Sequence, residues 1–149
     1  QVILSGTKRL VDLISQKLKS LGARSIIELN VSAPFHCSLM KNASLTMQDA
    51  LNEVVIKTPR IKFINNVNAK FVHNTSEIKK LLVNQVQSRV RWRESIYEAS
   101  TLNLDFLIEI GPGRVLTGLN KRMNIDAEYF NISTLEDINN FLRNYGDDL

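Results

Sequence analysis

The chain has 149 residues, of which 44% are hydrophobic, and a formal net charge of +4. This length and composition suit one globular domain or part of a larger one, and they exclude a disordered chain. No apolar run approaches the roughly 18 residues that a membrane-spanning helix needs. The single cysteine, Cys37, excludes an internal disulfide and a multi-cysteine zinc site. It favours a reducing compartment, either the cytoplasm or an organelle stroma or matrix.

The positive net charge favours an acidic partner, which could be a nucleic acid or a small acidic carrier protein. Most basic residues are scattered, and no RNA-binding or zinc-finger signature accompanies them. We therefore expect solvated surface to account for most of these charges. The first residues, Gln1-Val2-Ile3-Leu4, have the pattern of a strand without any lead-in, which indicates a fragment of a longer protein or a processed piece.

The first 31 residues alternate strand-like and helix-like runs. Val2–Leu4 predicts a short strand, Thr7 a helix N-cap, and residues 10–21 a helix with apolar side chains at helical spacing. Gly22 suits a left-handed helix cap. The run 25–31 is then predicted to be a second strand, which completes a β-α-β unit.

The remaining residues continue the same alternation. Asn74 with Glu77, and Ser133 with Glu136, have the spacing of capping boxes at helix starts. Alternating strands and helices predict an α/β fold with mainly parallel strand pairing. The predicted helices cover residues 39–54, 74–85, 92–99, 115–123 and a last one that stops near Gly146, and the predicted strands cover 61–64, 69–72, 106–110 and 128–132.

The loop 32–38 places His36 between a predicted strand and a predicted helix. Functional side chains favour such loops, and imidazole titrates closest to neutral pH, which suits proton transfer. A structural histidine is the alternative that the residues alone leave open. A catalytic pair of Cys37 with His36 is a poor interpretation, because neighbouring side chains diverge and catalytic pairs are normally distant in sequence.

Gly111-Pro112-Gly113 follows a predicted strand and precedes a predicted helix. Ligands of open α/β sheets bind at such carboxyl ends, although a tight turn that needs positive φ explains the glycines equally well. The segment lacks the further residues of a dinucleotide fingerprint or a phosphate-binding loop. Gln85, near the end of a predicted helix, has carbonyl groups that could orient a histidine ring.

Together these segments resemble a known family, the malonyl-CoA:acyl-carrier-protein transacylases. The resemblance covers almost the whole chain but only about the C-terminal half of that family. It implies the C-terminal part of an α/β-hydrolase-like parallel sheet in residues 32–149, plus half (β-α-β) of a ferredoxin-like inserted subdomain in residues 1–31. The matching segments, in order, are QVILSG (1–6), VSAPFHCSLM (31–40), NNVNA (65–69), VRW (90–92) and EIGPGRVLTGL (109–119).

This family transfers malonyl from coenzyme A to the phosphopantetheine thiol of acyl carrier protein through an acyl-serine, in fatty acid biosynthesis. The resemblance implies that His36 is the general base, which activates the serine and then the incoming thiol. It also implies that the backbone carbonyl of Gln85 holds the histidine ring. No metal or redox cofactor is expected, and malonyl-CoA and the carrier protein are the expected partners.

The resemblance also implies residues on the substrate side. Val115 matches a wall of the acyl pocket beside Gly111 and Gly113. Phe35 matches a position linked to the choice of malonyl over methyl-branched units, since an aromatic ring there leaves no room for an α-methyl group. Possible contacts with the carrier or with coenzyme phosphates are Lys79, Lys80, Lys121 and Arg122.

One family feature is missing: the sequence has no Gly-x-Ser-x-Gly nucleophile elbow. Ser32 and Ser38 lie too close to His36 in sequence to replace it. The nucleophile, an oxyanion-hole glutamine and a malonyl-binding arginine all belong to the missing N-terminal half, so we expect the chain alone to be inactive and to expose strand edges. The alternatives are an acyltransferase domain of a polyketide or multifunctional synthase, a basic nucleic-acid-binding module, and an inactive subunit.

Overall fold

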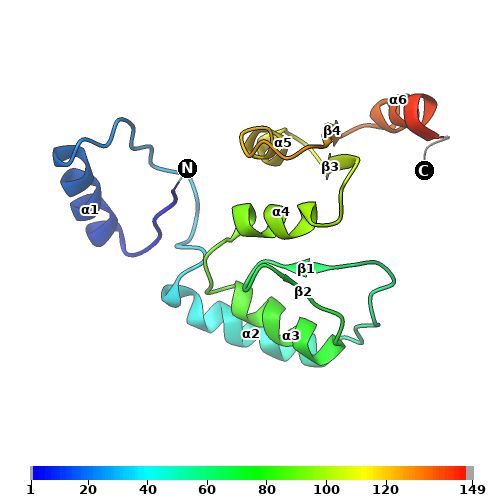
Figure 1. Ribbon diagram of the computed structural model, residues 1–149. Coiled ribbons are helices and arrows are strands. Elements are labelled where there is room, and N and C mark those ends of the chain that lie inside the picture. Colours follow the sequence, from blue (N-terminus) through cyan, green and yellow to red (C-terminus); the bar gives the residue numbers. More distant parts are fainter. Residues whose placement is uncertain (1, 147–149) are drawn as a thin grey trace. The chain divides into compact units, whose positions relative to one another are not determined.

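The computed structural model describes residues 2–146, so Gln1 of the first matching segment lies outside the described residues. The chain forms two compact units, residues 1–91 and 92–149, and each is considered by itself. Figure 1 labels their helices and strands in chain order. Within 2–146, no helix has the length and apolar character that crossing a bilayer requires.

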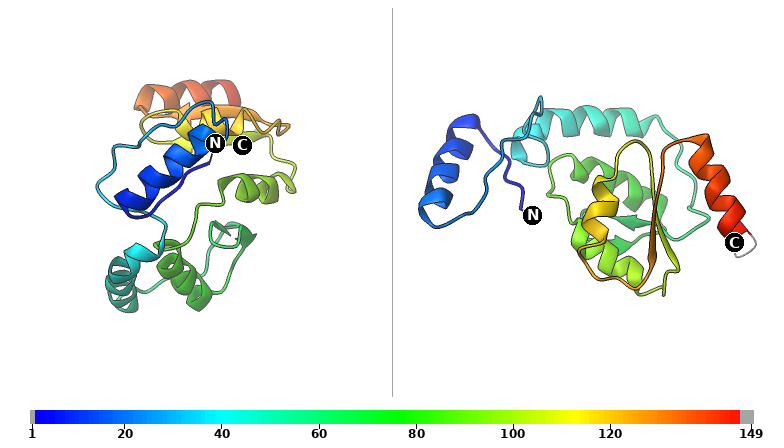
Figure 2. Two further views of the ribbon diagram at one scale, coloured as in Figure 1. Left: turned by 90° about the vertical axis from the view of Figure 1, so that its left-hand side faces the viewer. Right: turned by 90° about the horizontal axis from the view of Figure 1, so that it is seen from above.

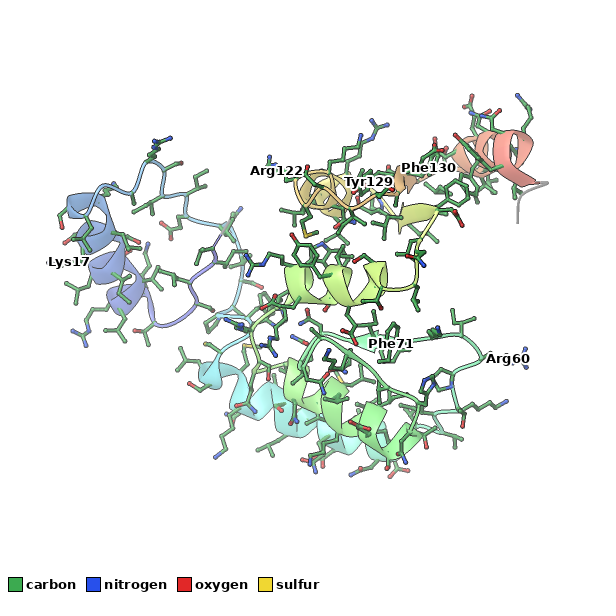
Figure 3. All side chains as sticks on the ribbon, viewed as in Figure 1. Lys17, Arg60, Phe71, Arg122, Tyr129 and Phe130 are labelled. Carbon is green, nitrogen blue, oxygen red and sulfur yellow. The ribbon has the colours of Figure 1, made fainter. Side chains whose placement is uncertain are left out.

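The first helix, α1 (Lys8–Ser20), begins and ends as its sequence predicts. The Thr7 hydroxyl accepts a hydrogen bond from the Leu10 N–H at 3.4 Å, and Gly22 takes a left-handed φ of +91° just after the helix. Lys17, labelled in Figure 3, and Lys19 lie in the last turn, where positive charge complements the helix dipole. None of the side chains of α1 is buried.

The two strands predicted around α1 are wrong in this structure. Residues 2–4 and 25–31 have no strand assignment, so no β-α-β unit forms there among the described residues. A strand is stabilised by its neighbours rather than by its own sequence, and these segments find no neighbour to pair with in residues 2–146. Their apolar side chains, such as Val2 and Ile27, are consequently exposed.

Two helices of the first unit lie side by side, as all views show (Figures 1 and 2). The helix predicted over 39–54 is a 3₁₀ turn, η1 (Ser38–Met40), followed by α2 (Lys41–Asn52). It packs on α3 (Thr75–Gln85), and buried Ser44 donates its hydroxyl to the Val83 carbonyl at 3.0 Å. Asn74 caps α3 as predicted, since its side-chain oxygen accepts from the N–H groups of Ser76 and Glu77.

A short hairpin precedes α3. Its strands, β1 (Ile64–Asn65) and β2 (Lys70–Phe71), pair antiparallel and are shorter than the predicted strands 61–64 and 69–72. The buried Asn65 side chain ties the turn together by accepting from two backbone N–H groups and donating to the Lys70 carbonyl at 2.9 Å. The core under this hairpin and α3 consists of Val72, Ile78 and Leu81, with Ile56, Phe63 and Val67 packed against it.

The second unit carries the parallel pairing that the sequence predicts. Strands β3 (Phe106–Ile110) and β4 (Glu128–Ile132) coincide with the predicted ranges and pair parallel, with Ile108 opposite Phe130. Between them lies α5 (Val115–Asn120), which ends three residues before the predicted limit. The chain turns there and reaches Asn124 in a left-handed conformation, with φ of +51°, which no helix can continue. The other helices of this unit are α4 (Trp92–Ser100) and α6 (Leu135–Tyr145).

Four aromatic rings join α6 to the sheet. The rings of Phe106, Phe130, Phe141 and Tyr145 lie 5.0–5.7 Å apart between centroids, mostly edge to face. Figure 3 labels Phe130 on β4. Such edge-to-face rings fix the helix against the strands more specifically than aliphatic contacts do.

The predicted cap of α6 is one residue out of register. Thr134 and Asp137, rather than Ser133 and Glu136, form the capping box. The Ser133 hydroxyl is occupied elsewhere, because it donates to the Gly111 carbonyl at 2.8 Å. The end of the helix, with Gly146 as C-cap, is where the sequence predicts it.

Candidate active site

His36 occupies an unusual backbone conformation in its loop. Its φ is +61°, in the left-handed region, which costs a residue with a Cβ about 1–2 kcal/mol. Such strain persists only where the surroundings enforce it, and it gathers at functional sites. The imidazole is exposed, so a reacting group can reach it.

The ring of His36 contacts the end of α3. Its Nδ1 lies 3.1 Å from the backbone carbonyl oxygen of Gln85, across 49 residues of sequence. A carbonyl oxygen can only accept, so this contact requires the proton on Nδ1. Nε2 then keeps its lone pair and is the atom that can take a proton from another group. The structure thus brings together the two residues for which the resemblance implies this contact.

Gln85 and Ser88 hold one another in a tight turn. The Gln85 side-chain Nε2 donates to the Ser88 carbonyl at 3.1 Å, while the Ser88 N–H donates to the Gln85 carbonyl at 3.3 Å. The same Nε2 lies 3.4 Å from Nδ1 of His36. The Gln85 carbonyl that faces the imidazole is therefore held in place by the two hydrogen bonds between Gln85 and Ser88.

Sequence reasoning assigned no role to Asn66, although it lies in one of the matching segments. Its Oδ1 accepts from the Arg91 N–H at 2.8 Å, and its Nδ2 donates to Gln85 Oε1 at 2.6 Å. Neither contact could be found from spacing, because the partners are 25 and 19 residues away.

The residues on either side of His36 form hydrogen bonds to backbone carbonyls of their own loop. The Cys37 thiol donates to the Pro34 carbonyl at 3.1 Å, in keeping with the poor prospects of a Cys37–His36 pair. Phe35 donates its N–H to the Ala33 carbonyl at 2.9 Å, and 46% of its surface remains exposed. The first unit thus brings His36 and Gln85 into contact, and Phe35 is the exposed residue just before His36 in the loop.

The second unit brings together Gly111, Gly113 and Val115. Gly111 and Gly113 have φ values of +131° and +91°, a backbone conformation that residues with a Cβ atom rarely adopt. The Gly111 carbonyl accepts from Asn131 Nδ2 at 3.3 Å as well as from Ser133, and its N–H donates to the Ile132 carbonyl. The turn is therefore fastened to the end of β4.

Glu109, another residue that sequence reasoning missed, fastens the other side of this turn. Its carboxylate accepts from the N–H groups of Leu116 and Thr117, at 3.1 and 2.7 Å, and from the Thr117 hydroxyl at 2.6 Å. These bonds, the Thr117 hydroxyl first, lower the pKa of Glu109. Val115 begins α5 and is 70% exposed. In the sequence, the signal that could have identified Glu109 is its position as an acidic residue two places before Gly111-Pro112-Gly113.

The predicted cationic contacts lie on two elements. Lys79 and Lys80 belong to α3, whereas Lys121 and Arg122 directly follow α5, where Figure 3 labels Arg122. Lys80, Lys121 and Arg122 are exposed, and Lys79 is half-buried. Across residues 2–146, no three His, Cys, Asp or Glu side chains are grouped so that they could hold a metal ion.

Comparison with known proteins shows one consistent similarity. No family model matches the chain. Curated relatives do match it, and they are named malonyl CoA-acyl carrier protein transacylase. The Staphylococcus aureus relative is 38% identical over 144 residues, which is 97% of this chain and 47% of that protein. The Haemophilus influenzae relative is 36% identical over 139 residues. The chain spans about half the length of the curated relatives it matches.

Solved structures agree with this similarity. The acyl-carrier-protein-S-malonyltransferase of Bartonella henselae superposes with a TM-score of 0.87 at 39% identity, over 95% of this chain and 45% of that one. A malonyl-transacylase solved with its type II polyketide synthase acyl-carrier protein superposes with the same TM-score at 33% identity. The α/β character and the parallel pairing predicted from the sequence are confirmed by this likeness.

Proposed function

We propose that this chain, homologous to the C-terminal half of the malonyl CoA-acyl carrier protein transacylases, supplies the general base of their acyl transfer. The single observation that carries the proposal is the 3.1 Å contact between His36 Nδ1 and the Gln85 carbonyl. It leaves Nε2 as the proton acceptor, which acyl transfer through an alcohol nucleophile requires.

The proton steps follow from that tautomer. Nε2 of His36 takes the proton of a serine hydroxyl as its oxygen attacks the malonyl thioester carbonyl. The carbon–sulfur bond then breaks, and the imidazolium returns the proton to the departing coenzyme A thiolate. In the second half-reaction Nε2 accepts the proton of the phosphopantetheine thiol, whose sulfur takes the malonyl group, and the serine oxygen recovers a proton. The Gln85 carbonyl stabilises the positive imidazolium in both halves.

The serine must come from outside these 149 residues. The sequence contains no Gly-x-Ser-x-Gly elbow, and Ser32 and Ser38 flank His36 too closely to meet its Nε2 in the required geometry. We therefore expect His36 to act on a nucleophile supplied by the N-terminal half of a transacylase, and we expect the isolated chain to transfer no malonyl.

Two parts of the chain would contact the acyl group: the Gly-Pro-Gly turn with Val115, and Phe35. Gly111 and Gly113 would shape the turn beside the acyl pocket, with Val115 as one wall. Phe35 would exclude an α-methyl group, which discriminates by only about 1–3 kcal/mol. The hydrogen bonds that join the Gly-Pro-Gly turn to the end of β4 and the exposure of Phe35 support these assignments.

Substrates and partners follow the relatives. Malonyl-CoA and an acidic acyl carrier protein are the proposed partners, in fatty acid biosynthesis, and Lys79, Lys80, Lys121 and Arg122 are the proposed cationic contacts. The acyl-carrier protein bound to one structural relative supports the carrier. By the same resemblance the reaction needs no metal or redox cofactor. The single cysteine favours a reducing compartment, either the cytoplasm or an organelle stroma or matrix. A nucleic-acid-binding module is not favoured by any relative.

The finer architecture remains part of the proposal. Residues 1–31 would be the second half of a ferredoxin-like small subdomain, and residues 32–149 the C-terminal part of an α/β-hydrolase-like large one. The unpaired apolar segments 2–4 and 25–31 support this, because strands of a missing half would give them neighbours to pair with.

The test uses a full-length transacylase that contains this sequence. We expect His36→Ala to lower radiolabelled malonyl transfer from malonyl-CoA to holo-carrier by 10²–10⁴-fold, the usual contribution of a general base. His73→Ala, which removes the other histidine of the chain, is the matched control and should leave the rate unchanged. Full transfer by His36→Ala, or normal turnover by the 149 residues alone, would refute the proposal.

A further inference from the structure

The structure assigns a positioning role to Asn66: it sets the ring orientation and tautomer of His36 by clamping Gln85. This inference deepens the proposed function and rests on His36 being the general base. Asn66 lies at the β1–β2 hairpin, is half-buried, and reaches both ends of the segment that follows α3.

The orientation of the Asn66 amide is settled by the backbone. The Arg91 N–H can only donate, so the atom 2.8 Å from it must be Oδ1 of Asn66. Nδ2 consequently faces Gln85 Oε1, at 2.6 Å. The side chain thus bridges the Arg91 backbone N–H and the side chain of Gln85.

That bridge in turn settles the Gln85 amide. With Oε1 facing Asn66, Nε2 faces the Ser88 carbonyl at 3.1 Å, which can only accept. Two independent partners therefore fix the same orientation. Gln85 is the last residue of α3, and helix ends fray more readily than helix interiors. Asn66 is what anchors this end to the hairpin.

The consequence reaches His36 through two competing contacts. The Gln85 carbonyl, at 3.1 Å from Nδ1, favours a proton on Nδ1 and a free lone pair on Nε2. The Gln85 side-chain Nε2, at 3.4 Å, would donate to Nδ1 in the opposite tautomer, which cannot accept a proton at Nε2. The Asn66 bond to Oε1 and the Ser88 bond to Nε2 keep the amide farther from Nδ1 than the carbonyl is, so the carbonyl contact dominates. Without the Asn66 bond the amide is free to move its Nε2 closer to Nδ1, which shifts the ring toward the unproductive tautomer.

The first measurement reads the tautomer itself. Long-range ¹⁵N–¹H spectra of the chain distinguish Nδ1–H from Nε2–H, and its two histidines give two patterns that His73→Gln assigns. We expect Nδ1–H to prevail for His36 and its share to fall in Asn66→Ala and Asn66→Asp. Asn66→Asp still accepts from the Arg91 N–H, but it can donate neither to Gln85 Oε1 nor to the Arg89 carbonyl, which Asn66 Nδ2 meets at 3.5 Å. It therefore removes the donating side of Asn66 and keeps the accepting side.

Asn68→Ala is the matched control. Asn68 bonds to Asn65 and Lys70 within the same hairpin, and its bonds do not extend to Gln85. We expect it to leave the His36 pattern unchanged. The inference is overturned if Asn68→Ala shifts the pattern as much as Asn66→Ala does, or if neither Asn66 variant shifts it.

A second measurement is independent of the isolated chain. In the full-length transacylase, Asn66→Ala should lower kcat for malonyl transfer about tenfold while KM for malonyl-CoA stays constant, because one hydrogen bond acting on the base is lost. In a Gln85→Ala background, which keeps the backbone carbonyl but removes the clamped amide, Asn66→Ala should have no further effect. An equal additional loss there would show that Asn66 does not act through Gln85. If His36→Ala were fully active the proposed function would fail, whereas the tautomer shift would still decide the role of Asn66.

Discussion

At the scale of single residues, the site depends on which atom of each polar group is free to donate or accept. His36 could be singled out from its loop, and Gln85 from a family resemblance. The contact between them was implied by that resemblance alone, because a separation of 49 residues leaves no periodic trace in a sequence. Asn66 and Glu109 escaped notice for the same reason, since their partners become neighbours only when the hairpin and the Gly-Pro-Gly turn form.

Glu109 makes the stability of the second unit depend on pH. Its pKa is lowered, chiefly by the Thr117 hydroxyl, from an ordinary value of 4.5, so its contribution is fully present above that value. The contribution is lost as the pH falls through the lowered pKa of the folded state. We expect the midpoint of thermal unfolding, followed by circular dichroism, to fall on acidification below about pH 4.5.

The variant Glu109→Gln should be less stable than the parent at neutral pH and should show a shallower fall on acidification. Asp137, whose pKa is lowered first by the Ser133 N–H, keeps part of the dependence in that variant. Glu136→Gln is the control, and its pH profile should follow the parent. A Glu109→Gln profile that matches the parent at every pH would contradict this account.

At the scale of elements, the sequence pattern predicted those helix caps and strands whose formation depends on nearby residues. The apolar runs at 106–110 and 128–132 became β3 and β4 with the predicted limits, and Thr7 and Asn74 cap their helices. The runs at 2–4 and 25–31 look equally strand-like but lack paired neighbours within residues 2–146. Strand formation thus depends on partners that composition cannot reveal.

The N-terminal cap of α6 lies one residue later than the sequence predicts, at Thr134 rather than Ser133. Thr134→Ala should destabilise the chain by about 1 kcal/mol, because it removes the side chain that accepts from the Asp137 N–H at 3.1 Å. Glu136→Ala, in the same turn but outside the capping box, should change stability by less than about 0.5 kcal/mol. Urea unfolding followed by circular dichroism measures both. Equal effects of the two substitutions would restore the register predicted from the sequence.

At the scale of the whole molecule, many large apolar side chains of the described residues are exposed and few are buried. Ile110 is 82% exposed at the end of β3, and Val115 is 70% exposed nearby in the chain. The parallel sheet has two strands, so each strand of it carries one unpaired edge among the described residues. Exposed edges and apolar patches of this kind promote association.

We expect the 149-residue chain to self-associate at micromolar concentration in analytical ultracentrifugation. Ile110→Lys should reduce association, because it places a charge where the exposed strand ends. Thr101→Lys, on an exposed polar position, is the control and should leave association unchanged. A monodisperse monomer for the parent chain would show that these surfaces are harmless.

The hydrogen bonds that orient the His36 imidazole all lie within one short part of the chain. His36, Asn66, Gln85 and the Arg91 amide belong to a single uninterrupted stretch of 36–91 within one unit. A gene broken upstream of that stretch would leave these contacts within one piece. Under the proposed function, such a break would separate the general base from its serine while the imidazole stays positioned.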